Sequence, residues 1–181
     1  TSFLEGIRNP TEGTDDPGTV FMRKFDVQDS TRIYLDSGLA LARQDRDFEA
    51  FVWYTRALEL SPDSYEVHNH LGLALAELGA RDRALRHFNR ALEIDPDRVG
   101  AYTNLGLFLL KDGRLEEAAN FFSVVIEGHP DQVEAFANLG SIREAQGNNQ
   151  EAIRIYRQAL EQSPDYDPVR QSLNRLLDTE N

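Results

Sequence analysis

The sequence contains no cysteine among its 181 residues. Disulfide bonds, thiolate metal ligands and cysteine nucleophiles are therefore excluded. The absence does not indicate a compartment, because a protein without thiols tolerates reducing and oxidising surroundings equally. A soluble protein of the cytoplasm or the periplasm, attached to a membrane only through a partner if at all, fits this composition.

Long apolar segments and an excess of positive charge are also missing. No apolar run reaches the ~20 residues of a membrane-spanning helix, and no signal-peptide pattern opens the chain. Lys and Arg total 19 against 31 Asp and Glu, giving a formal net charge of -12. An acidic surface repels phosphate and anionic lipid, so we expect neither nucleic-acid binding nor direct membrane insertion. Hydrophobic residues make up 40%, enough for a packed core.

The residue patterns of catalytic sites are missing as well. The sequence has no phosphate-binding glycine loop and no G-x-S-x-G motif. Glu66 and His70 are four residues apart and could contact one metal ion from a helix, but two ligands do not form a stable site. We therefore expect no enzyme activity, no cofactor and no metal centre.

What the sequence does contain is a period of 34 residues. Four kinds of residue recur at this spacing, four times each. They are the glycines Gly38, Gly72, Gly106 and Gly140, the alanines Ala50, Ala84, Ala118 and Ala152, the aromatic residues Tyr54, Phe88, Phe122 and Tyr156, and the prolines Pro62, Pro96, Pro130 and Pro164. A fixed period of this length indicates a chain of stacked, similar units.

Each period predicts two helices. In residues 65–98, apolar residues recur at helical spacing up to Leu78, and again from Ala84 to Ile94. Gly79 is expected to end the first helix, and Pro96 prevents the second from continuing. One such hairpin cannot bury its own apolar face, so neighbouring hairpins must stack to form a continuous core.

These columns resemble the tetratricopeptide repeat (TPR) family. Its pattern W-x2-L-G-x2-Y…A-x3-F…P is matched by the Leu71-Gly72 and Leu105-Gly106 pairs together with the alanines, aromatic residues and prolines above. The resemblance implies an all-α fold, a right-handed α-solenoid of four helix-turn-helix repeats. The repeats are expected at residues 31–64, 65–98, 99–132 and 133–166.

The segments outside the repeats differ from each other. Asp167-Pro168 is a typical helix start, and apolar residues follow it at helical spacing. We therefore expect residues 167–178 to form a C-terminal capping helix that covers the last repeat. Residues 1–30 contain prolines and glycines without a helical period, and Asp16-Pro17-Gly18 is typical of a turn. The sequence predicts an extended N-terminal arm over residues 1–30.

The resemblance also implies where a partner binds, because in this family the first helix of each repeat lines the concave side. Transferred to this chain, Leu39, Leu73 and Leu107 share one column, with Leu35 and Leu110 beside it. An exposed stripe of leucines is typical of an interaction site. A tightly wound solenoid would instead bury the same leucines as core, and the sequence leaves both interpretations open.

Polar residues accompany these leucines in the expected lining. Asn104 and Asn138 share a column with His70, and some TPR proteins use side-chain amides in this way to hold a peptide backbone. The remaining polar lining expected to contact a partner is Arg43, Asn69 and Lys111. A protein or peptide partner follows from the resemblance.

The arm carries Phe3, Leu4 and Ile7 near its start, and Phe21 and Phe25 near its end. We hypothesise that Phe21 and Phe25 cap the solenoid, while Phe3, Leu4 and Ile7 anchor the chain to a partner. The first functional hypothesis is a scaffold or assembly factor that holds a partner polypeptide in its groove. The alternative is a constitutive, non-catalytic subunit of a larger complex, including a membrane-bound one, docked through the arm. Solenoids that stack end to end are a third hypothesis.

Overall fold

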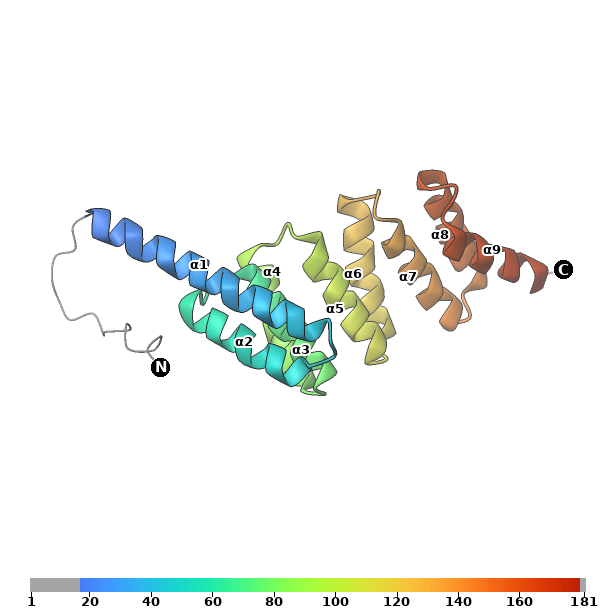
Figure 1. Cartoon of the computed structure of the whole chain (residues 1–181). Coiled ribbons are helices and arrows are strands. Elements are labelled where there is room, and N and C mark those ends of the chain that lie inside the picture. The colour runs from blue at the N-terminus through green and yellow to red at the C-terminus, as the bar shows by residue number, and fades with distance from the viewer. Residues whose placement is uncertain (1–16, 180–181) are drawn as a thin grey trace.

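The computed structural model describes the backbone of residues 17–179 and the side chains of residues 27–178. Within these ranges the chain consists of helices and turns without strands, arranged as a row of packed hairpins (Figure 1). The hairpins are α1 (Pro17–Ala42) with α2 (Asp47–Leu60), α3 (Tyr65–Glu77) with α4 (Arg81–Ile94), α5 (Val99–Lys111) with α6 (Leu115–Gly128), and α7 (Val133–Ala145) with α8 (Asn149–Gln162). A single helix, α9 (Asp167–Thr179), follows. The predicted all-α solenoid is confirmed.

The turn within each hairpin depends on one residue with a left-handed backbone. Gly79, Gly113 and Gly147 have φ angles of 75°, 77° and 77°, and Asp45 holds the equivalent position in the first hairpin at 57°. A residue in this conformation ends a helix by turning the chain away from its axis. Glycine adopts it without the steric cost that a side chain brings.

The alanine and aromatic columns form the core of every hairpin. Ala50, Ala84, Ala118 and Ala152 are all 0% exposed, and the aromatic residues one turn later are also buried. The two helices lie so close that a Cβ atom on Gly72 would be 2.7 Å from Cδ1 of Phe88. The glycine column is therefore required by helix packing rather than by any contact with a ligand.

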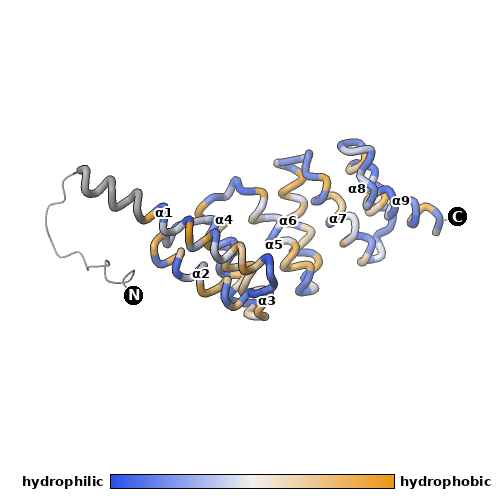
Figure 2. Tube along the Cα trace, viewed as in Figure 1, coloured by the Kyte–Doolittle hydropathy of each residue, from blue (hydrophilic) through white to orange (hydrophobic). Residues whose placement is uncertain are grey.

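A second set of buried residues joins one hairpin to the next. Val67, Ala101, Ala135 and Val169 occupy one column at the start of successive hairpins and of α9, and each is 0–2% exposed. Ile33 occupies the same column in α1 but is 61% exposed, because no hairpin precedes it in the described part of the chain. In Figure 2 hydrophobic and hydrophilic segments alternate along the helices, while the turns are mainly hydrophilic.

The prediction of an extended arm is wrong for residues 17–30, which form the first part of α1. Figure 1 shows this long helix projecting beyond α2. Proline is tolerated in the first turn of a helix, where its missing N–H has no partner to lose, so Pro17 begins a helix rather than a turn. After Gly18, no proline or glycine interrupts the chain until Gly38. The anchor residues Phe3, Leu4 and Ile7 lie outside the described residues, as do the side chains of Phe21 and Phe25.

Candidate functional site

The first helices of the hairpins carry the expected lining on what we call the groove face. We define this face by the side chains of Leu35, Leu39, Arg43, Asn69, His70, Leu73, Asn104, Leu107, Leu110, Lys111 and Asn138. Leu73 on α3 is 37% exposed and Leu107 on α5 is 42% exposed. Leu35 and Leu39 pack partly against the core cluster that contains Tyr54. The structure therefore exposes the central leucines of the stripe and partly buries those at its α1 end.

An amide pair connects α3 to α5 on this face. Asn104 Nδ2 donates a hydrogen bond to Asn69 Oδ1 at 3.0 Å. Asn69 is only 6% exposed, so it is buried beneath the surface and positions Asn104 rather than facing a ligand itself. The side-chain carbonyl oxygen of Asn104 accepts no hydrogen bond within the described residues. The side chain of the half-buried Asn138 makes no hydrogen bond there either. Two side-chain amides thus remain able to bond a peptide backbone.

His70 differs from these amides. Its ring stacks on Tyr54, with 5.6 Å between the centroids and 25° between the planes. Burial lowers the pKa of His70, and the nearby Glu66 carboxylate opposes this only in part. The imidazole is therefore neutral at pH 7 and contributes an uncharged, half-buried surface to the groove face.

Charged residues accompany the leucines and amides of this face. Lys111 Nζ is 2.9 Å from both carboxylate oxygens of Glu77, but both side chains are more than half exposed, so the pair adds little stability. Arg43 is exposed and makes no ion pair within the described residues. At the α1 end, a cavity of about 470 Å³ opens between α1 and the connection from α2 to α3, and Arg32, Leu35 and Glu66 are part of its lining.

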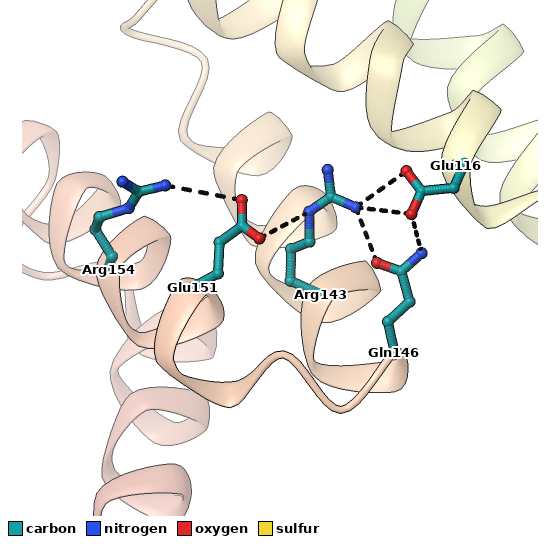
Figure 3. Close-up of polar contacts among 5 residues, drawn as sticks. All are labelled: Glu116, Arg143, Gln146, Glu151 and Arg154. Carbon is teal, nitrogen blue, oxygen red and sulfur yellow. Dashed lines mark hydrogen bonds and ion pairs between the residues drawn. The ribbon is translucent and has the colours of Figure 1, made fainter.

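Two polar clusters behind the groove face were not expected from the sequence. The first surrounds Arg143, where the equivalent residues of the second and third repeats are the buried Leu75 and Leu109. Arg143 Nη1 is 3.2 Å from both carboxylate oxygens of Glu116, and its Nε is 3.4 Å from Glu151 (Figure 3). The replacement of leucine by arginine in a 34-residue column was the signal that could have indicated this cluster.

The second cluster is a histidine pair between α3 and α4. His68 Nδ1 lies 2.9 Å from His87 Nδ1, and His68 Nε2 lies 3.0 Å from the Pro62 carbonyl oxygen. Because that carbonyl can only accept, His68 must donate through Nε2 and accept from His87 through Nδ1. Burial is the largest cause that lowers the pKa of His87 to about 4, and electrostatic interactions with His68, Arg83 and Arg86 lower it further.

Neither cluster resembles a metal or catalytic centre. Among the side chains that the structure describes, no three histidine or carboxylate groups come together as a metal site would require. None of the helices between residues 17 and 179 combines the length and hydropathy that crossing a bilayer requires.

Comparison with known proteins supports the repeat architecture. Residues 33–163 match the family model of the cilia and flagella-associated protein 70 middle TPR-like domain. No curated protein sequence matches the chain. A structure from the functional characterization of Pseudomonas aeruginosa pilF is 22% identical with a TM-score of 0.77, covering 86% of this chain and 71% of that one. MamA residues 41 to the end from Desulfovibrio magneticus RS-1 are 22% identical with a TM-score of 0.72, covering 84% and 86%.

Proposed function

Because the chain belongs to the family of the cilia and flagella-associated protein 70 middle TPR-like domain, we propose that it is a scaffold holding a segment of a partner polypeptide on its groove face. TPR domains in general bind proteins and are non-catalytic, which supports a protein-interaction scaffold as the coarse function. We further propose that the groove face is the binding surface and that its side chains contact the partner.

One observation carries the proposal, namely the exposure of Leu73 and Leu107 in a column of equivalent positions. Both leucines are exposed on helices whose other apolar side chains are buried or partly buried. Covering the exposed part of each leucine would contribute about 1 kcal/mol to binding. The amides of Asn104 and Asn138 lie in the adjacent column and would fix the register of the bound backbone.

The way in which the partner is held separates two roles. An assembly factor holds its partner transiently through the groove face. A constitutive subunit of a larger complex stays bound, and the anchor that we hypothesised for this role is Phe3, Leu4 and Ile7. The exposed leucines favour the first role, because such a surface must remain accessible between binding events.

The test compares three forms of the full chain in affinity purification from the native source. The wild type is compared with the double variant Leu73→Glu/Leu107→Glu and with the control Leu78→Glu. Leu78 is also exposed, at 43%, but lies at the C-cap of α3, outside the leucine column. We expect a partner that the wild type and the control retain and the double variant loses, with all three forms equally helical by circular dichroism.

Two results would count against the proposal. If the double variant unfolds while the control does not, the leucines are part of the core. If it stays folded and retains every partner, the groove face is not the binding surface. A partner that remains stoichiometric through high salt, and is lost only on Phe3→Ser/Leu4→Ser/Ile7→Ser, would favour the constitutive subunit.

A further inference from the structure

A hollow in the third repeat lies apart from the groove face. It has a volume of about 170 Å³ and forms between the connection after α4, the start of α5 and the end of α6. Its lining includes Pro96, Asp97, Val99, Tyr102, Val124 and Gly128. None of the residues that define the groove face contributes to it.

Gly128, one of the residues that line the hollow, has no side chain. The equivalent residues of the first and second repeats are Leu60 and Ile94, both half-buried. A Cβ atom built on Gly128 meets no other atom within 4 Å, and the residue has an ordinary negative φ. The backbone therefore does not require glycine here, and the space next to Gly128 is open where the first and second repeats carry aliphatic side chains.

The rim of the hollow also departs from the other repeats. Val124 is 48% exposed, whereas the equivalent positions carry Arg56, Arg90 and Gln158. Two independent departures, at Gly128 and at Val124, thus fall on the same hollow, where valines lie beside the polar Asp97 and His129. An exposed apolar concavity of this kind is typical of a site that receives a side chain from outside.

We propose that this hollow is a second docking site, which takes a leucine or isoleucine side chain of a partner polypeptide with a basic residue next to it. The valines and the proline of its lining suit an aliphatic side chain, and the chain itself carries Leu60 and Ile94 at the position of Gly128 in two other repeats. The basic neighbour follows from Asp97, which is exposed at the rim and makes no ion pair within the described part of the chain.

The proposal can be tested by methyl NMR on the full chain with N-acetyl-leucyl-arginine amide as the probe. We expect saturable shifts at Val99, Val124 and Val125, the valines of the hollow. N-acetyl-alanyl-arginine amide should bind about tenfold more weakly, because it lacks most of the carbon atoms that the hollow would bury. N-acetyl-leucyl-glutamate amide should bind more weakly at low salt than at high salt, since Asp97 repels it.

Two variants at one position separate filling of the hollow from any effect on helix stability. Gly128→Leu places the residue of the first repeat in the hollow and should abolish the saturable shifts. Gly128→Ala improves helix propensity in the same way but leaves the hollow open, so it should bind the probe like the wild type. Circular dichroism should show both variants folded with at least wild-type thermal stability.

Three results would overturn the proposal. The first is no saturable shift at the three valines with the leucine probe. The second is an equal response of the Gly128→Leu and Gly128→Ala variants. The third is a shift at Val124 that grows with protein concentration alone and disappears in Ile33→Ser. Arg32 and Ile33 are an exposed basic and aliphatic pair, so this last result would mean that a second copy of the chain, not a partner protein, fills the hollow.

Discussion

Arg143 allows a quantitative test of how the third and fourth repeats are held together. Its side chain is 18% exposed, so most of its aliphatic stem is packed between α6, α7 and α8. Its Nε has an ion-pair contact with Glu151 but no hydrogen bond of good geometry. Glu116, its other partner, is 69% exposed and can be rehydrated when the arginine is removed. We therefore expect packing of the stem to contribute more than the charge.

The expected magnitudes follow from these exposures. Arg143→Ala removes two packed methylene groups, worth about 1.6 kcal/mol. Loss of a partly exposed ion network adds about 0.5 kcal/mol, so the free energy of unfolding should fall by about 2 kcal/mol. Arg143→Leu restores the residue of the second and third repeats, and should change it by less than about 1 kcal/mol because a buried ion pair is often replaced without loss. Arg154→Ala, 72% exposed at the edge of the network, should have almost no effect.

Urea unfolding followed by circular dichroism measures these differences, and the pH provides a second criterion. Hydrogen bonds from Arg143 and Gln146 lower the pKa of Glu116 in the folded chain. A lowered pKa stabilises the fold at neutral pH, and this contribution is lost as the pH falls through the folded-state value. Arg143→Leu should therefore gain stability relative to the wild type as the pH falls from 7 to 3. If Arg143→Leu is as unstable as Arg143→Ala at pH 7, the charges and not the stem hold the interface, and the reasoning is wrong.

Two further predictions concern the core. Gly72→Ala places a Cβ 2.7 Å from the Phe88 ring and should lower the free energy of unfolding by about 1–3 kcal/mol, whereas Gly128→Ala should not, as urea titrations would show. His87, with its pKa lowered to about 4, should make the wild type lose stability as the pH falls from about 6.5 towards 4, because folding then excludes a proton that the unfolded chain binds. The variant His68→Tyr/His87→Phe, which copies Tyr102 and Phe121, should flatten the melting temperature over this range, and an unchanged pH dependence would contradict this assignment.

The 34-residue period was sufficient to predict the helical hairpins, because glycine, alanine and aromatic residues recur at the positions where two helices must approach closely. The N-terminal segment was predicted wrongly because Pro17-Gly18 has the composition of a turn and also that of a helix start. Only the neighbouring residues decide between them, and from Thr19 to Ser37 nothing breaks a helix. Local composition was a poor guide there because helix continuity is a property of the whole segment.

The groove face was harder to predict than the helices. The sequence placed Leu39 and Leu73 in one column, yet the structure leaves Leu73 exposed and partly buries Leu39. The exposure of each leucine depends on how closely the adjacent hairpins approach each other. The identities of residues at equivalent positions of the repeats do not give that distance. Asn69 was expected to face a ligand, but its side chain is buried and accepts a hydrogen bond from Asn104 of the next repeat. Such pairing between columns is not visible from the period alone.

Polar contacts join each hairpin to the next in addition to the apolar columns. Short connections such as residues 61–64 already fix the order of the hairpins, and the apolar columns are nearly the same at every interface. The polar contacts differ at each interface. The contacts are His68 with the Pro62 carbonyl before the second hairpin, Asn69 with Asn104 and Glu77 with Lys111 before the third, Arg143 with Glu116 before the fourth, and Glu144 with Arg175 before α9.

A shift of one hairpin along the next would separate the pairs that join helices of different hairpins. Arg143 would then lose Glu116 and keep only Glu151 of its own hairpin. The same contacts set Leu73 beside Leu107, since Asn69 and Asn104 join the two helices that carry these leucines. The core therefore comes from the residues that the repeats share, while residues in which they differ add a particular contact at each interface.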